Sequence, residues 1–200
     1  MNPELTTFAE SLERWNLHNH PFYQAWSAGT LPQAALAEYA RDWGSFVRVI
    51  DMGWETVGKR EYAAEERVHA ELWDDFAAAL DTRATDNAQI PALAQLRSTA
   101  ERLFATPATA LGALYAFEAQ QPSTSKSKLD GLRAHYNLES KAEYYFAVHQ
   151  DDFAEAEWIA GAISQLSDED RKLAESACEE LCHALWDGLS GIYDEDCAMA

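Results

Sequence analysis

Apolar side chains recur every three or four residues through most of the chain, which is the spacing of amphipathic α-helices. The pattern predicts helices over residues 3–16, Pro21 to Trp26, Pro32 to about Val57, 60–81, Pro91–Phe104, 107–121, Ser123–Tyr136, Ser140 to about Ser164, and Ser167 to about Tyr193. The longest predicted loop is Asp81–Pro91. No segment alternates apolar and polar residues convincingly, so we expect an all-α protein of seven to nine helices.

Two of the predicted helices, Pro32 to Val57 and 107–121, are apolar on most sides and are therefore expected at the centre of the fold. The second contains one charged residue, Glu118. A single carboxylate in such surroundings must be paired, protonated or bound to a metal ion, because burying a bare charge is costly. An ion pair and a metal site both remain open, although the chain has only 15 basic residues to supply the pair.

Composition indicates one globular domain over residues 1–200, since hydrophobic residues make up 48% and Gly (9) and Pro (6) are scarce. The net charge of −19 repels nucleic-acid phosphates and anionic membrane surfaces, which argues against both as partners. No apolar run approaches the roughly 20 residues that span a bilayer. The first residues lack the basic and apolar regions of a signal peptide, so we expect a cytoplasmic protein.

The three cysteines, Cys178, Cys182 and Cys197, all lie in the last part of the chain and do not form a disulfide framework. Cys178 and Cys182 are four residues apart on a predicted helix, with His183 adjacent. A zinc site and a pair of buried thiols are the two interpretations. The second is favoured, because no further Cys/His pair completes four ligands.

Three sites combine carboxylates and imidazoles at helical spacing. Glu65 and His69 lie one turn apart on one helix face, although this segment taken alone is also typical of a solvated surface. Glu118 is the second site. The third is His149 with Asp152 and Glu155, at steps of three residues.

Carboxylates and histidines from several helices that meet inside a bundle hold pairs of iron or manganese ions. A ligand set of oxygen and imidazole nitrogen without thiolate suits these two metals. We therefore predict a non-haem metal oxidase whose metal ligands are Glu65, His69, Glu118, His149, Asp152 and Glu155. Two iron ions are expected, with manganese as the alternative, and no haem.

Several segments, in this order along the chain, are more specific evidence than the spacing of the candidate ligands. They are His20–Trp26 with Gly29–Leu31, Glu65-Glu66 before His69–Trp73, Tyr115–Pro122 leading to Lys128–Leu132, and Tyr145-Phe146 before His149. In these segments the chain resembles the heme-oxygenase-like diiron oxidases. Within that family it resembles the relatives of the chlamydial protein associating with death domains (CADD), in the wider superfamily of TenA and the pyrroloquinoline-quinone synthases.

The resemblance implies a single heme-oxygenase-like helical bundle that binds two irons and activates O2, the co-substrate, on a small organic molecule. It places Glu65, His69, Glu118 and His149 on the first four ligand positions of the family. The superfamily also implies a homodimer.

The chain departs from the family's His-x-x-x-Asp-x-x-His segment. Counted from His149, the Asp position holds Phe153 and the last His position holds Ala156, while Asp152 and Glu155 come one residue earlier. A local register shift such as a π-bulge would restore the pattern. Otherwise the second metal ion is held differently, or is weakly bound or absent.

Lys128 falls where relatives implicated in para-aminobenzoate formation carry a lysine near the metals, and the alternative is an ordinary surface lysine beside Lys126. Tyr23, Tyr39 and Tyr115 are redox-active if they lie near the metals, and otherwise pack in an aromatic core. We predict Lys128 and Tyr23 as the catalytic residues.

An iron-dependent oxidase or oxygenase of a small molecule is thus the expected function, and two alternatives stay open. A TenA-like hydrolase of aminopyrimidines needs a cysteine nucleophile, whereas all cysteines here lie near the carboxyl terminus. A non-catalytic metal-binding or protein-interaction domain is the other.

Overall fold

The computed structural model describes residues 5–197, with side chains to residue 194, and all regular structure in this range is helical, as predicted. The helices are α1 (Thr6–Arg14), η2 (Leu17–Asn19), α2 (Pro21–Ser27), α3 (Gln33–Asp42), α4 (Gly44–Val47), α5 (Ile50–Thr56), α6 (Arg60–Ala78), α7 (Pro91–Leu103), α8 (Pro107–Glu118), α9 (Gln121–His135), η3 (Ser140–Glu143), α10 (Tyr144–His149), α11 (Ala154–Ile163) and α12 (Asp168–Cys197). Eight of them have nine residues or more, which confirms the predicted bundle of seven to nine helices.

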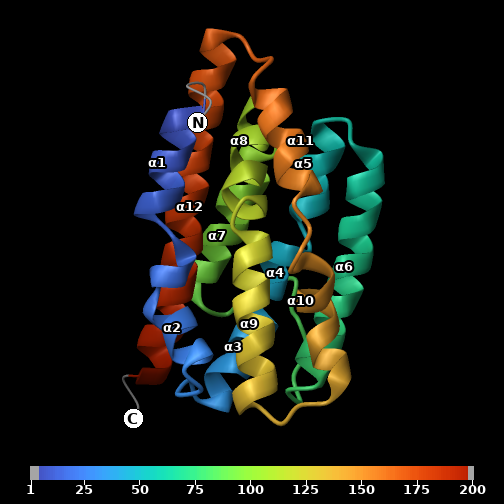
Figure 1. Cartoon of the computed structure of the whole chain (residues 1–200), viewed down its shortest axis with the longest axis vertical. Coiled ribbons are helices and arrows are strands. Elements are labelled where there is room, and N and C mark those ends of the chain that lie inside the picture. Colours follow the sequence, from blue (N-terminus) through green and yellow to red (C-terminus); the bar gives the residue numbers. More distant parts are fainter. Residues whose placement is uncertain (1–4, 198–200) are drawn as a thin grey trace.

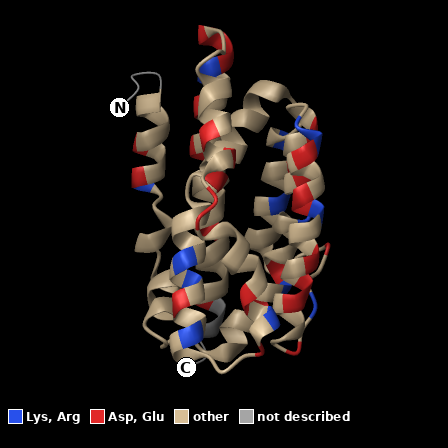
Figure 2. Cartoon of the chain, turned by 45° about the vertical axis from the view of Figure 1, so that its right-hand side comes forward, with Lys and Arg blue, Asp and Glu red and all other residues tan. Residues whose placement is uncertain are grey.

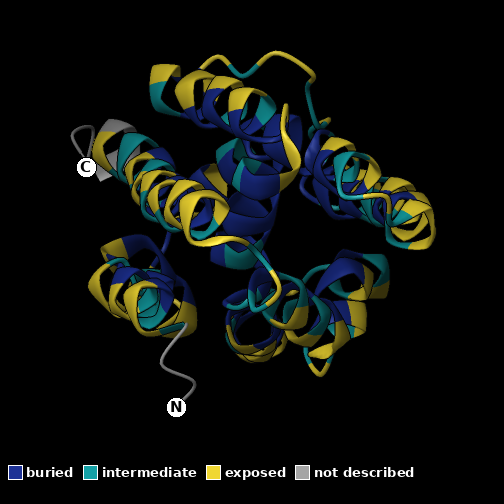
Figure 3. Cartoon of the chain, turned by 90° about the horizontal axis from the view of Figure 1, so that it is seen from above, coloured by how far each residue is buried: buried dark blue, intermediate teal, exposed yellow. Residues whose placement is uncertain are grey.

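Helix α8 lies at the centre of the bundle, where it packs against α12, α11 and α5 (Figure 1). Its apolar sequence is buried as predicted. Seen from above, the buried faces of the helices point into the bundle and their exposed faces point outward (Figure 3). Gly112 allows the close approach of α12, since a Cβ atom at this position would lie 1.9 Å from the carbonyl oxygen of Ala174. The single carboxylate of α8, Glu118, is thereby enclosed.

The predicted helix from Pro32 to Val57 is interrupted and forms α3, α4 and α5. At the two bends the amide of Phe46 donates to the carbonyl of Trp43 and the amide of Val49 donates to Phe46, both in the tighter i to i−3 pattern. At the first bend the buried carboxylate of Asp42 accepts the amides of Gln89 and Ile90. The prediction of a single continuous helix is therefore wrong, although the segment is buried as expected.

The predicted helix from Ser140 to Ser164 is also interrupted, with a break at residues 150–153 between α10 and α11. Asp152 Oδ1 accepts the amide of Ala154 at 3.1 Å, which satisfies a free donor at the start of α11. His149 thus ends one helix and Glu155 lies in the first turn of the next. This segment therefore does not form a continuous helix with a π-bulge.

Asp and Glu positions outnumber Lys and Arg positions along the helices (Figure 2). Most described ion pairs join partly or fully exposed side chains. Within residues 5–197 no helix combines the length and the apolar character needed to cross a bilayer.

Candidate metal centre

Five buried or half-buried side chains from four helices meet inside the bundle: Glu66 and His69 of α6, Glu118 of α8, His149 of α10 and Glu155 of α11. They form two groups of three, Glu66–His69–His149 and Glu66–Glu118–Glu155. Within each group the possible ligand atoms all lie within 4.8 Å of one another. Glu66 belongs to both groups, which is the arrangement of two adjacent metal sites joined by a shared carboxylate.

Four residues of the predicted ligand set, His69, Glu118, His149 and Glu155, are in this cluster, whereas Glu65 is exposed and its neighbour Glu66 is 2% exposed. Consecutive residues of an α-helix point about 100° apart, so only one of the two glutamates can face the interior. The apolar spacing of Ala63 and Trp73 includes position 66, and this signal in the sequence indicates Glu66 as the interior residue.

Each carboxylate of the cluster keeps an oxygen atom without a hydrogen-bond partner. The atoms are Glu66 Oε2, Glu118 Oε1 and Glu155 Oε1, and all three are buried. A buried carboxylate oxygen without a partner is costly. No lysine or arginine in the described part of the chain pairs with Glu118, so the ion pair that the sequence left open does not form. Three such oxygens in a cluster that also contains two imidazoles fit divalent metal ions.

The pKa values of the carboxyl groups reflect this crowding. Burial, together with the negative charges of Glu155 and Glu66, raises the pKa of Glu118 well above its ordinary value. Burial, with Glu66 and Asp152, raises the pKa of Glu155 to about 8. Repulsion therefore keeps these groups from being ionised together at neutral pH unless cations lie between them.

The two imidazoles are oriented toward the same space. His149 Nδ1 donates to the carbonyl oxygen of Tyr145 at 2.5 Å, which leaves Nε2 with its lone pair, 3.1 Å from His69 Nδ1. His69 Nδ1 also lies 3.3 Å from Glu66 Oε1. Burial and the nearby His69 lower the pKa of His149 to about 3, so its ring is neutral, as a metal ligand must be.

Asp152, another predicted ligand, lies at the edge of the cluster and belongs to neither group of three. Its carboxylate instead holds the start of α11, as described above, and so fixes the direction of Glu155 in the first turn of that helix. The structure places Asp152 as a support of Glu155 and Glu155 itself at the cluster.

Lys128 is 4% exposed, so the alternative interpretation of this residue as an ordinary surface lysine is wrong. Its Nζ atom lies 3.5 Å from the hydroxyl oxygens of both Tyr23 and Tyr39, which are 3.1 Å from each other. Burial lowers the pKa of the Lys128 amine to about 7. Tyr145 lies beside the cluster, with its ring 4.4 Å from that of His149.

Cys178 and Cys182 are buried free thiols of α12, as favoured from the sequence. A hydrogen bond with Cys182, together with burial, raises the pKa of the Cys178 thiol well above its ordinary value, which is the opposite of what a nucleophile needs. No described group of three potential metal ligands contains either cysteine. The side chain of Cys197 lies outside the described residues.

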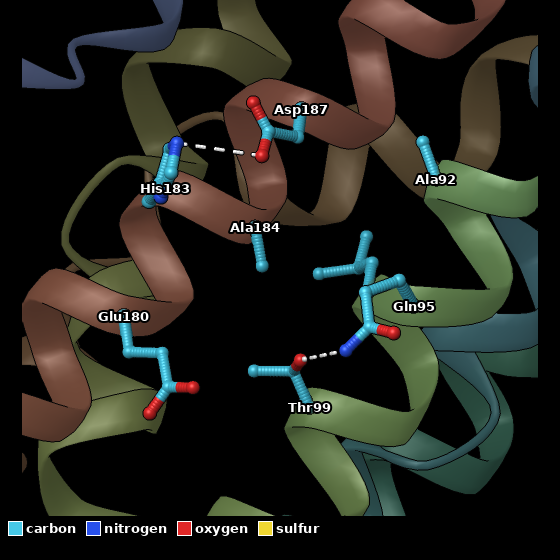
Figure 4. A pocket seen from close by; sticks show the side chains of 8 residues that line it. Ala92, Gln95, Thr99, Glu180, His183, Ala184 and Asp187 are labelled. Atoms are coloured by element: carbon cyan, nitrogen blue, oxygen red, sulfur yellow. Dashed lines mark hydrogen bonds and ion pairs between the residues drawn. The ribbon is translucent and has the colours of Figure 1, made fainter.

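His183 is exposed and pairs with Asp187 at 3.3 Å, beside a groove of about 220 Å³ between α7 and α12 (Figure 4). The polar groups of this groove are paired at the surface: Gln95 donates to Thr99 Oγ1, and Glu180 accepts from Arg102. The groove therefore lacks the buried unpaired oxygens that distinguish the cluster at Glu66.

Comparison with known protein families gives one match over most of the chain. Residues 47–189 match the family described as iron-containing redox enzymes with a haem-oxygenase-like domain. This range includes all five residues of the cluster as well as Lys128.

Curated proteins with similar sequences include a 4-aminobenzoate synthase of Nitrosomonas europaea, 29% identical over 92% of this chain and 88% of that protein. A 4-aminobenzoate synthase of Chlamydia pneumoniae is 28% identical over 71% of this chain and 72% of that protein.

Solved structures with the same fold include a TenA homologue from Pseudomonas syringae, with a TM-score of 0.76 and 16% identity over 96% of this chain and 93% of that one. A CADD-like protein from Nostoc punctiforme has a TM-score of 0.62 and 15% identity over 94% of this chain and 95% of that one. At these identities the similarity establishes the fold.

Proposed function

Since the chain belongs to the family of iron-containing redox enzymes and is an iron-dependent oxidoreductase, we propose that its buried centre binds two metal ions and uses O2 to oxidise a small organic molecule. The observation that carries this proposal is the set of three buried carboxylates, each with an unpaired oxygen, in one cluster with two imidazoles. Iron is the expected metal, and manganese in one position is compatible with the same ligand types.

In the proposed assignment His69 and His149 hold one ion, Glu118 and Glu155 hold the other, and Glu66 is shared. Glu66 thus takes the role that the sequence assigned to Glu65. The break before α11 turns Glu155 inward, so the second metal position has a carboxylate ligand from this segment. When bound, iron supplies the one-electron and O2 chemistry that amino-acid side chains lack.

The residues of the chain prepare this centre in two ways. The three carboxylates offset most of the charge of two divalent ions, and burial beneath α6 and α11 limits access of bulk water. The hydrogen bond from His149 Nδ1 to the Tyr145 carbonyl fixes the ring so that Nε2 faces the ions. Both features are present before a metal binds.

We assign Lys128 and Tyr23 as the residues that face the substrate, with Tyr39 beside them. The Lys128 amine has a pKa of about 7, so a large fraction is neutral at physiological pH and can act as a base or a nucleophile. The rings of Tyr23 and Phe146 lie 5.0 Å and 5.2 Å from its Nζ atom. An aromatic substrate class suits these surroundings, and the name of the curated relatives supports 4-aminobenzoate as the product to test.

The test is an anaerobic titration of metal-free protein with Fe(II), alone and with Mn(II), in which bound ions are counted. Oxygen consumption and formation of 4-aminobenzoate from an added aromatic precursor, detected by mass spectrometry, are then followed after O2 and a reductant are added. Two bound ions with metal-dependent O2 uptake are expected. Wild-type protein that binds no metal would overturn the proposal, and O2 uptake without 4-aminobenzoate would overturn only the product.

A further inference from the structure

A cleft of about 210 Å³ opens between α6 and the α4–α5 segment, on the outer side of the metal centre. It is lined by Val47, Arg48, Asp51, Glu66, Arg67 and Ala70. Its volume admits several water molecules at roughly 30 Å³ each. Glu66 lies at its floor and is the residue common to both groups of three in the cluster. The cleft therefore connects the surface to the shared carboxylate.

This cleft differs from a surface groove because it contains the buried carboxylate of Glu66. The residue is 2% exposed and its Oε2 atom is buried without a partner, although Oε1 faces His69. A buried, unpaired carboxylate oxygen beside an aqueous cleft favours a cation. In the groove between α7 and α12, by contrast, Gln95 pairs with Thr99 and His183 pairs with Asp187 at the surface (Figure 4).

The mouth of the cleft carries two guanidinium groups and more carboxylates than are needed to neutralise them. Arg67 pairs with Asp51 at 2.9 Å and with Glu55 at 2.7 Å. Arg48 pairs with Asp74 at 2.5 Å and with Asp86 at 3.3 Å. The local charge is therefore negative, and it concentrates cations from solution.

We propose that this cleft is the access route by which divalent metal ions reach the centre, an inference that rests on the proposed two-metal function. The Asp51 carboxylate, whose side chain is 21% exposed, receives the hydrated ion when it leaves Arg67. Arg67 remains paired with Glu55 during this exchange. The ion then loses water to Glu66, which passes it to the histidines on one side or to Glu118 and Glu155 on the other.

An anionic ligand at the two arginines is the competing occupant of this cleft. Arg48 Nη2, Arg67 Nε and Arg67 Nη2 donate to the carboxylates of Asp74, Asp51 and Glu55, and Arg48 Nε lies 3.3 Å from the Asp86 carboxylate without forming a hydrogen bond. An anion would also approach Glu66 at the floor, where like charges repel. The observations therefore favour the cation.

The experiment measures the rate at which metal-free protein binds Co(II), a spectroscopic substitute for Fe(II), by anaerobic stopped-flow absorption. Ala70→Leu narrows the cleft, and Ala9→Leu is the matched control in a surface cleft on α1. Asp51→Asn removes the receiving carboxylate. Glu180→Gln is its control, because it also removes one carboxylate from an ion pair with arginine, on α12.

We expect Ala70→Leu to slow association by about tenfold with an unchanged dissociation constant and stoichiometry, because a route affects both directions equally. Asp51→Asn should slow it by roughly three- to tenfold, most strongly at low salt. The two controls should bind at the wild-type rate. Two-ion binding at unchanged rates in both cleft variants would overturn the route alone. Absence of metal binding by the wild type would overturn the two-metal centre and the route with it. Faster binding in Asp51→Asn would favour an anion and overturn the inference.

Discussion

The carboxyl groups of Glu118 and Glu155 lie within 4.8 Å of each other inside the bundle, although the two residues come from different helices, α8 and α11. Burial and the neighbouring carboxylates raise the pKa of both groups, so that at neutral pH at least one of them keeps its proton. The metal-free centre therefore stores a proton that metal ions must displace. Metal binding should consequently depend on pH, and so should the stability of the metal-free protein.

The first prediction concerns Glu155→Gln in metal-free protein. The folded pKa of Glu155 is about 8 and its ordinary value is 4.5, so between these values the folded state holds more protons than the unfolded state. The stability associated with Glu155 is full below pH 4.5 and is lost as pH rises through about 8. Glu155→Gln should therefore gain unfolding free energy relative to wild type over this window, at about 1.4 kcal/mol per pH unit at most.

Urea unfolding of both proteins at pH 5, 6, 7 and 8, in the presence of chelator, measures this difference. Comparing the two proteins cancels the titration of groups elsewhere in the chain. Added Mn(II) should stabilise the wild type above pH 7 and the variant much less. A difference that stays constant with pH would contradict the raised pKa of Glu155.

The second prediction distinguishes the roles of two adjacent glutamates, Glu65 and Glu66, in metal binding. Glu66→Gln removes the carboxylate common to both groups of three and should lower metal affinity by more than about 100-fold, since even the loss of an outer partner of a ligand costs 10–100-fold. Glu65→Gln changes the same charge on the exposed side of α6 and should still bind two ions. Titration with Fe(II) and metal analysis measure both. Loss of metal in Glu65→Gln alone would reverse the assignment.

The third prediction concerns the buried lysine. Lys128 has a folded pKa of about 7 against an ordinary 10.5, so its burial destabilises the protein fully below pH 7, and this cost disappears as pH rises toward 10.5. Lys128→Met should thus increase stability, most strongly at pH 6, and should abolish product formation while two metal ions still bind.

Lys126→Met is the matched control for this variant. It lies two residues away with an exposed side chain and a surface ion pair to Asp130 at 3.4 Å, so it should change stability by less than about 1 kcal/mol and leave activity intact. Thermal unfolding at pH 6 and pH 9, with a product assay, measures both. A stability gain in Lys128→Met that is equal at the two pH values would show that burial does not lower the pKa of the Lys128 amine.

The fourth prediction distinguishes a hydrogen-bond acceptor before α11 from a metal ligand at Asp152. Asp152→Ala should cost about 1 kcal/mol of stability, because the amide of Ala154 loses its acceptor. Asp152→Asn keeps a side-chain oxygen that accepts the same hydrogen bond, and should retain both the stability and the two bound ions. Metal loss in Asp152→Asn at unchanged stability would make Asp152 a ligand after all.

The helical class, most helix positions and the presence of an isolated carboxylate in an apolar helix follow from the amino-acid sequence alone. These features are local, since hydrophobic spacing follows the helix period and the cost of a bare charge in an apolar segment holds in any fold. Glu118 and His149 could therefore be identified as candidate site residues before their neighbours were known.

Which residues face one another depends on how the helices pack in the folded protein. A choice between Glu65 and Glu66 turns on a rotation of about 100°, and the helices that cover α6 set this rotation. The break at residues 150–153 and the burial of Lys128 depend equally on contacts between distant segments. Spacing along one helix fixes relative directions on that helix, whereas the direction of the interior is a property of the assembled bundle.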